Sequence, residues 1–374
     1  AVGQALKEKV GDSYLGKGEQ FWLEDVREFS TLAMMELIRE DLLALGVKMD
    51  VFYSEKSLYG TGLIEAAIED LKSKGLIYQG VLEPPKGKKP EDWEPREQTL
   101  FRSTDHGDDV DRPVQKSDGS WTYFAPDIAY HYDKVQRGFD QLIDVFGADH
   151  GGYVKRMKAA VSALSNDKTS LDIKLTQLVK LFKNGAPFKM SKRAGTFVTL
   201  RDLVDQVGAD ATRFVMLTRK NDAPLDFDFD KVMEQTKENP VFYVQYAHAR
   251  ICSVMRKAQL AGVAVEDAVL QAADLAGLTD AAELTLAAKL AEFPRLIEIA
   301  ARSNEPHRIA FYLYDLASEF HALWNKGNEQ PELRFLQEGN LATSQAKIAL
   351  IRATAVVISN GLGILGVQPA QEMR

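Results

Sequence analysis

Three cationic side chains, Lys189, Lys192 and Arg193, fall within five residues of one predicted loop. Met190 and Ser191 separate the two lysines. A loop of this composition suits a strongly anionic group whose shape changes during a reaction. In nucleotidyl transfer at an α-phosphate, negative charge builds on the transferred group and on the leaving pyrophosphate, and positioned cations stabilise that charge. A solvated basic turn is the alternative interpretation.

A glycine-rich turn lies upstream of this loop, after an apolar stretch at 141–146 that predicts a buried strand. Gly147, Asp149 and His150 lead from this strand into a helix predicted at 151–164. Parallel sheets bind ligands beyond the carboxyl ends of their strands, and a helix N-terminus offers free N–H groups to an anion. Asp149 could accept a hydrogen bond from a ribose hydroxyl, and His150 could contact a phosphate or an amine. The alternative is an ordinary turn without a ligand.

Tyr123 and Asp127 form a second candidate pair. Tyr123 ends a strand predicted at 121–124, and Asp127 lies in the first turn of a helix predicted at 127–135. A carboxylate beside a phenol suits a planar cation, because aspartate accepts a guanidinium group through both oxygens. A helix-capping aspartate beside a core tyrosine is the alternative.

The charge of the chain is unevenly distributed. The 374 residues are 45% apolar and 27% charged, with a formal net charge of −8. Between His150 and Arg193, however, ten Lys or Arg residues stand against two acids. Polyphosphate or a nucleic-acid backbone is the natural partner for such a basic region. Two lysine-decorated surface elements would give the same count.

Cysteine usage and hydropathy exclude several classes of protein. Cys252 is the single cysteine, so the chain has neither a disulfide framework nor a cysteine metal site. We predict no metal site, because no dedicated carboxylate cluster is apparent. No run of 18 or more apolar residues is present, so we expect no membrane span. A cytoplasmic monomer is the expectation.

Apolar periodicity predicts an α/β region followed by a helical one. Helices are expected at 24–46, 62–75, 127–135, 151–164, 199–207 and 210–218, and strands at 47–53, 98–103, 121–124, 141–146 and 171–182. Strands alternating with helices indicate a parallel sheet. From Lys231 onward, long alanine-rich periods predict an all-α bundle, with helices at 240–260, 281–301, 306–325 and 343–365.

Several motifs resemble one enzyme family. The pentapeptide Lys-Met-Ser-Lys-Arg at 189–193 resembles the KMSKS signature of class I aminoacyl-tRNA synthetases, with arginine in place of the last serine. Four further stretches resemble arginyl-tRNA synthetases in particular, namely 104–112, 123–131, 146–153 and 239–250. The likeness runs from about Gly16 to the C-terminus.

The resemblance implies an enzyme that activates L-arginine with ATP and then esterifies the 3′ end of tRNA(Arg), with Mg²⁺ accompanying the ATP. It places Tyr123, Asp127 and His150 at the arginine. The ATP contacts that it implies are Gly147, Asp149, His150, Lys189, Met190, Ser191 and Lys192, with Lys189 and Lys192 as the catalytic lysines. The tRNA contacts that it implies are Tyr243, Gln245, Tyr246 and Arg250 on a recognition helix, and Phe320 and Trp324 one helical turn apart. Stacking on an anticodon base would suit the last two, and a hydrophobic helix face is their alternative.

The implied organisation has three parts. Residues 1–115 would be an insertion within the catalytic domain. Residues 116–230 would be the second half of a Rossmann-like catalytic domain and would carry the pentapeptide at 189–193, which we call the lysine loop. Residues 231–374 would be the anticodon-binding domain. One departure from the family is the lack of a His-x-Gly-His motif. We therefore expect a C-terminal portion of a longer chain, inactive in adenylate formation by itself. The alternatives are a class I synthetase for another amino acid, a different adenylyltransferase, or a non-catalytic tRNA-binding module.

Overall fold

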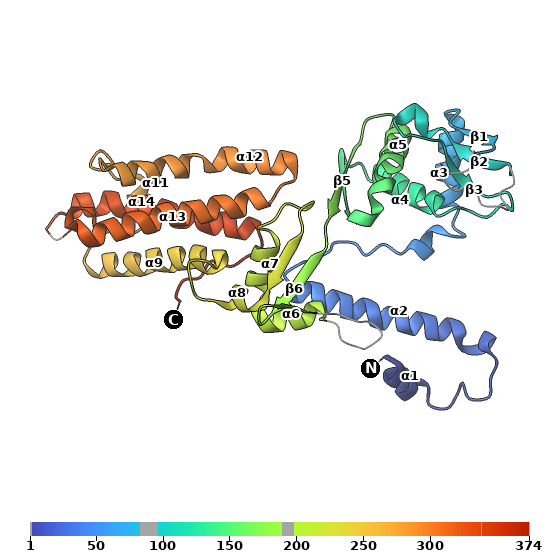
Figure 1. The fold of residues 1–374 in the computed structure, drawn as a ribbon, viewed down its shortest axis with the longest axis horizontal. Coiled ribbons are helices and arrows are strands. Elements are labelled where there is room, and N and C mark those ends of the chain that lie inside the picture. The colour runs from blue at the N-terminus through green and yellow to red at the C-terminus, as the bar shows by residue number, and fades with distance from the viewer. Residues whose placement is uncertain (1, 83–95, 189–197, 338, 374) are drawn as a thin grey trace. The chain divides into compact units, whose positions relative to one another are not determined.

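The chain folds into two units, seen in a computed structural model that describes residues 2–82, 96–188, 198–337 and 339–373 (Figure 1). We call Met49–Leu178 together with Asn221–Pro224 the mixed unit. The helical unit consists of Ala1–Lys48, Val179–Lys220 and Leu225–Arg374. The predicted fold class is confirmed, because small sheets with parallel strands are followed by a helical C-terminal region.

In its described residues, the mixed unit contains two small sheets and three principal helices. An antiparallel sheet is ordered β1-β2-β3, with strands β1 (Ile77–Gly80), β2 (Gln98–Phe101) and β3 (Arg112–Gln115). The helices are α3 (Leu63–Ser73), α4 (Phe124–Gln136) and α5 (Val154–Ser165). Short 3₁₀ turns lie at η1 (Glu55–Leu58), η2 (Ser103–His106) and η3 (Ala148–Tyr153). Leu71, Ile128 and Ala160, one from each helix, are fully buried in a shared core.

A parallel pair of strands, β4 (Gln141–Gly147) and β5 (Ser170–Thr176), positions the glycine-rich turn. The predicted strand is confirmed, but only one of its faces is covered. Leu142 and Asp144 are buried, whereas the alternate residues Ile143 and Val145 are 46% and 66% exposed. Side chains alternate between the two faces of a strand, so β4 is buried on one face, and the prediction of a buried strand holds for that face alone.

The helical unit begins with α1 (Val2–Val10) and α2 (Glu19–Ala44). Its sheet is ordered β7-β6-β8, with β6 (Val179–Lys183), β7 (Ala186–Pro187) and β8 (Leu225–Asp228), and β6 runs parallel to β8. Its shorter helices are α6 (Leu200–Val207), α7 (Ala209–Met216), α8 (Phe229–Met233) and α10 (Asp267–Gln271). The bundle helices are α9 (Pro240–Leu260), α11 (Ala281–Ala291), α12 (Phe293–Ser303), α13 (His307–Glu329) and α14 (Leu341–Ile364), with the turn η4 (Pro331–Leu333) after α13.

The bundle core forms where α9, α13 and α14 pack on one another. Asn239 caps α9 and Pro240 occupies its first turn, the position where a missing N–H costs nothing. Gly361 lets α14 approach α13 closely, because a Cβ there would lie 2.7 Å from Leu313. By length and composition α14 could cross a membrane, but many of its residues are buried against the other bundle helices, as in the core helix of a globular bundle.

Four predicted elements differ from the structure. Residues 47–53 form no strand, since no strand among the described residues pairs with them. Residues 121–124 are not a strand either, because only Trp121 bridges to Gln115 and Phe124 already begins α4. The segment 171–182 is two strands in separate sheets, β5 and β6. The helix predicted at 281–301 is two, α11 and α12, and Pro294 in the first turn of α12 cannot continue the earlier helix.

Candidate functional site

The Asp127 carboxylate lies in the first turn of α4 and is half-buried. The Tyr153 hydroxyl donates a hydrogen bond to its Oδ2 atom. Burial raises the pKa of Asp127, and the hydrogen bond from Tyr153 and the neighbouring charge of His131 only partly oppose this rise. Tyr123 stands at the N-terminal end of the same helix with 91% of its surface exposed. A partly desolvated carboxylate beside an exposed phenol is an arrangement that suits a cationic ligand.

A buried network supports α4 beneath Asp127. The two ring nitrogens of His131 lie 2.8 Å from the Asp127 carbonyl oxygen and 2.7 Å from Oδ2 of Asp144 on β4. Lys134 donates to the other Asp144 oxygen at 2.8 Å. Burial alone would raise the pKa of Asp144, but hydrogen bonds from His131 and Lys134 outweigh burial and hold the pKa at about 2. Asp144 is therefore ionised, and it joins the strand to the helix that carries Asp127.

The glycine-rich turn follows β4 directly, as predicted. Gly147 ends the strand, and Asp149 and His150 lie exposed in η3. His150 Nε2 is 3.7 Å from an oxygen of Asp149. A Cβ on Gly147 would lie 2.6 Å from Asp149 Oδ1, so a side chain there would force the carboxylate to move. The same turn leads into Tyr153, which places this turn and Asp127 in one region of the mixed unit.

The lysine loop lies outside the described residues, so the roles of Lys189, Met190, Ser191, Lys192 and Arg193 stay predictions. The flanking elements are described. Strands β6 and β7 precede the loop, and α6 follows it with a capping box between Thr199 and Asp202. The loop thus connects a small sheet of the helical unit to α6, a helix whose N-terminus is capped.

Aromatic rings and one guanidinium form a cluster between α9 and α13. The Arg250 guanidinium lies 4.2 Å from the ring centre of Tyr246 and 4.8 Å from that of Trp324. His321 accepts a hydrogen bond from Arg250 at 3.3 Å through Nδ1 and donates to the Tyr243 carbonyl at 3.3 Å through Nε2. Burial and the nearby Arg250 charge outweigh the hydrogen bond to the Tyr243 carbonyl and lower the pKa of His321 to about 4, so the ring is neutral. Four predicted tRNA residues are thereby brought together: Tyr243, Tyr246, Arg250 and Trp324.

The other two predicted tRNA residues are engaged in contacts within the chain, although Phe320 lies next to the cluster with its ring centre 6.1 Å from that of Trp324. Gln245 donates to the Gln368 carbonyl at 3.1 Å and so contacts the C-terminal segment. Phe320 is fully buried and stacks on Phe335 with ring centres 5.9 Å apart. The prediction that Phe320 stacks on a base is therefore wrong, because the ring is already enclosed in the bundle core.

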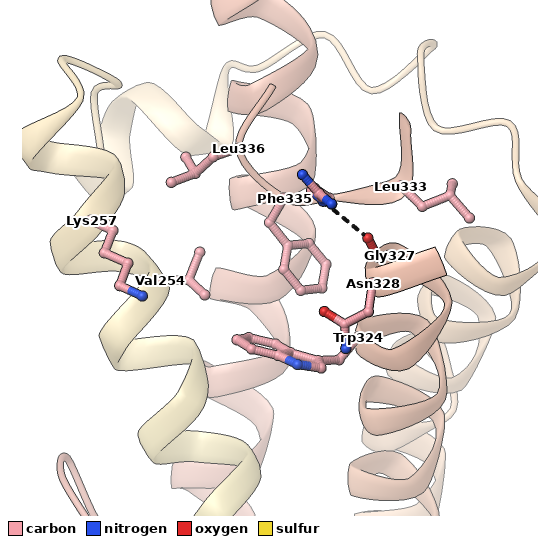
Figure 2. Close-up of a pocket in the computed structure, with 9 residues that line it drawn as sticks. Val254, Lys257, Trp324, Gly327, Asn328, Leu333, Phe335 and Leu336 are labelled. Carbon is pink, nitrogen blue, oxygen red and sulfur yellow. Dashed lines mark hydrogen bonds between the residues drawn. The ribbon is translucent and has the colours of Figure 1, made fainter. Parts of the chain in front are cut away.

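A cavity of about 180 Å³ opens beside Trp324 (Figure 2). Trp324, Phe335 and Val254 give it apolar walls, and Lys257 of α9 extends along its side. None of the nine described residues that line it is acidic. An apolar slot bordered by cations suits a flat uncharged ring that is joined to an anionic group, as the base and the phosphate are in an unpaired nucleotide.

One residue and one polar hollow carry no signal in the sequence. Tyr153 lies in the motif at 146–153, but no sequence pattern connects it to Asp127, because the contact spans 26 residues. A polar hollow of about 860 Å³ between α9 and α14 contains Arg256 and Arg352, which pair with Glu372 and Asp267. Spacing along two distant helices gives no signal for this hollow. Among the described residues, no group of three or more His, Cys, Asp or Glu side chains is placed to hold a metal.

The family models and the curated relatives that match this chain point to the same family. Residues 16–255 match the family described as class I tRNA synthetases (R), catalytic domain, and residues 244–373 match the DALR anticodon binding domain. An arginine–tRNA ligase of Roseobacter denitrificans is 78% identical over 373 residues, covering 100% of this chain and 64% of that protein. An arginine–tRNA ligase of Ruegeria pomeroyi is 76% identical with the same coverage. The chain thus spans 64% of the length of these curated relatives.

Solved structures give the same picture. A crystal structure from Campylobacter jejuni that is assigned as an arginyl-tRNA synthetase has a TM-score of 0.81 and 31% identity, covering 100% of this chain and 74% of that one. The Thermus thermophilus arginyl-tRNA synthetase has a TM-score of 0.69 at 19% identity, covering 94% of this chain and 64% of that one. The second likeness is one of fold.

Proposed function

We propose that this chain, which belongs to the class I arginyl-tRNA synthetase family, carries binding sites of an arginine–tRNA ligase. In the proposed reaction the arginine carboxylate attacks the α-phosphorus of ATP, and the bond to pyrophosphate breaks. A hydroxyl at the 3′ end of tRNA(Arg) then attacks the carbonyl carbon of the adenylate, and AMP leaves. Catalysis of such transfers rests on positioning and on charge stabilisation.

The environment of the Asp127 carboxylate is the observation that supports the proposal most strongly. Its carboxylate is half-buried, and in the part of the chain that the structure describes, no cation pairs with it. A guanidinium group would supply the missing positive charge and would favour the ionised form of a group whose pKa burial raises. Tyr123 and His150 are proposed to contact the same arginine, since both are exposed in the mixed unit.

ATP is proposed to bind at the glycine-rich turn and the lysine loop. Gly147, Asp149 and His150 would contact the nucleotide, and the exposed turn leaves room for it. Lys189 and Lys192 would neutralise the departing pyrophosphate, with Met190 and Ser191 in the same loop. Mg²⁺ would accompany the phosphates, but the described residues offer no acidic cluster to hold it, so we assign it no protein ligand.

The tRNA is proposed to contact the bundle through the cluster of Tyr243, Tyr246, Arg250 and Trp324. Arg250 is stacked between two rings and is held by His321, so its charge is presented on a rigid support. The cavity beside Trp324 would accept an unpaired base. Gln245 would act only through the C-terminal segment that it holds.

Organisation and location follow from the same proposal. The insertion (1–115), the catalytic half-domain (116–230) and the anticodon-binding domain (231–374) remain the proposed domains. We propose that the protein acts in the cytoplasm as a monomer. A synthetase for another amino acid and a non-catalytic module are disfavoured, because the curated relatives are named arginine–tRNA ligases.

Ligand binding to the purified chain tests the arginine pocket. Asp127→Asn should weaken L-arginine binding by about tenfold or more, since it removes a charged hydrogen-bond acceptor, and should change ATP binding little. Asp133→Asn is the matched control, because Asp133 is a half-buried aspartate of the same helix that pairs with Arg137. Equal losses for arginine and ATP would contradict the assignment of Asp127.

Binding of labelled tRNA tests the bundle surface. A tRNA(Arg) transcript should bind more tightly than the same transcript with a swapped anticodon, and Arg250→Ala should reduce this preference. Lys192→Ala should leave tRNA affinity nearly unchanged. A large loss of tRNA affinity in Lys192→Ala would move that lysine from the pyrophosphate to the nucleic-acid surface.

A further inference from the structure

Tyr153 joins the glycine-rich turn to the proposed arginine pocket. It ends η3 and directly precedes α5, and its hydroxyl donates to Oδ2 of Asp127 on α4. No described residue is hydrogen bonded to the other oxygen of Asp127. One carboxylate oxygen is therefore fixed by the protein, and the other is left for a ligand.

The Tyr153 ring is itself held in place. Phe124 and Phe146 meet it edge-on, with ring centres 6.0 Å and 6.4 Å away. The Arg156 guanidinium lies 4.9 Å from its ring centre. A ring packed by two aromatic neighbours and a cation has little freedom, so its hydroxyl is a fixed donor.

We propose that Tyr153 is a positioning residue that fixes the Asp127 carboxylate so that its free Oδ1 meets the cationic end of the substrate. This inference rests on the proposed function, because it adds to the arginine site a residue that had no role there. Tyr153 touches Asp127 and acts on the ligand through it.

Tyr153 also influences the pKa of Asp127. Burial raises the pKa of Asp127, and Glu55 and Asp144 raise it further by charge repulsion. The hydrogen bond from Tyr153 and the charge of His131 lower it. Burial raises the pKa of Tyr59, and Asp127 and Tyr123 add to this rise by charge, so the phenols of Tyr59 and Tyr123 lie near the same carboxylate. Removal of the Tyr153 hydroxyl takes away one of the contacts that lower the pKa of Asp127. Asp127 should therefore take up a proton at higher pH.

Tyr153→Phe isolates the hydroxyl, because the ring and its packing are retained. We expect the variant to bind L-arginine about tenfold more weakly, with a greater loss near about pH 5 than near about pH 8. Tyr132→Phe, a half-buried tyrosine of α4, is the matched control and should bind as the wild type does. An unchanged affinity and pH profile in Tyr153→Phe would overturn the inference.

Two further measurements separate this inference from the proposed function. Carboxyl-carbon NMR should show a higher pKa for Asp127 in Tyr153→Phe than in the wild type, with or without arginine. If the wild type binds no arginine but this pKa rises, the proposed pocket fails and the positioning stands. In Asp127→Asn, the tyrosinate titration of Tyr153 should move to lower pH, because Asp127 helps to raise the pKa of that phenol. No movement in either titration would refute the contact.

Discussion

His131 and Asp144 form a buried pair in which Nε2 of the ring lies 2.7 Å from Oδ2 of the carboxylate. Only 5% and 6% of the two side chains are exposed. The second nitrogen of His131 lies 2.8 Å from the backbone carbonyl of Asp127. The pair therefore connects β4 to the helical turn that presents Asp127, and the geometry of the proposed pocket depends on it.

Asp144→Ala should destabilise the mixed unit by about 3 kcal/mol, because it leaves His131 and Lys134 buried without their partner. Urea denaturation would measure the loss. Asp172→Ala on the neighbouring strand is the control, since Asp172 pairs with Lys174 at a more exposed position and should cost less than about 1 kcal/mol. Similar losses in the two variants would show that the buried pair contributes little.

The Asp144 carboxylate should also cause the free energy of unfolding to fall at acid pH. The pKa of Asp144 is about 2 in the folded chain and about 3.9 in an unfolded one. Its contribution is thus present above about pH 4 and is lost as the pH falls toward about 2. The wild type should lose about 2–3 kcal/mol more than Asp144→Asn across this window. Parallel curves for the two proteins would contradict this assignment.

Local sequence patterns predicted local structure well and long-range contacts poorly. The helix expected at 240–260 is α9 itself, since its cap, its proline and its period all lie within the segment. The strand expected at 47–53 failed, because apolar content does not provide a paired neighbour. Asp127 was proposed from its residue type and position, whereas its partner Tyr153 comes from another element and carries no local signal.

Helical spacing also left the roles of Phe320 and Trp324 undecided. Residues four apart lie on one helix face, and the sequence does not say what covers that face. Phe320→Ala should destabilise the bundle by about 3–5 kcal/mol, because the ring is fully buried. Trp324→Ala should instead weaken tRNA binding by about 1–3 kcal/mol and should destabilise the bundle less than Phe320→Ala does, because Trp324 is only half-buried. Thermal unfolding and tRNA titration of both variants would distinguish the roles, and a reversed pattern would contradict them.

His321 should make the bundle sensitive to mild acid. Burial lowers its pKa to about 4 in the folded chain, against about 6.5 when unfolded. The unfolded chain therefore binds a proton first as the pH falls, and stability should decline by about 3 kcal/mol between about pH 6.5 and about pH 4. His321→Gln should remove most of this decline, as measured by denaturation at several pH values. A decline of the same size in the variant would assign it to other groups.

Glu283 on α11 and Lys347 on α14 form an ion pair with only 3% and 4% of their side chains exposed. Glu283 also accepts a hydrogen bond from the Asp280 backbone N–H, so the pair is joined to the capping box that starts α11. Lys347→Met leaves a buried carboxylate without its cation and should cost about 3–5 kcal/mol. Glu283→Gln keeps the cap but leaves a buried ammonium group, with a similar cost.

The double variant should be more stable than the two single losses predict together, because no uncompensated charge remains. We expect a coupling free energy of at least about 2 kcal/mol from this cycle in urea denaturation. The exposed pair Arg302–Glu298 on α12 provides the control cycle, with an expected coupling below about 1 kcal/mol. Additive losses at Glu283 and Lys347 would mean that water reaches the pair in solution and that the helices are joined by apolar packing alone.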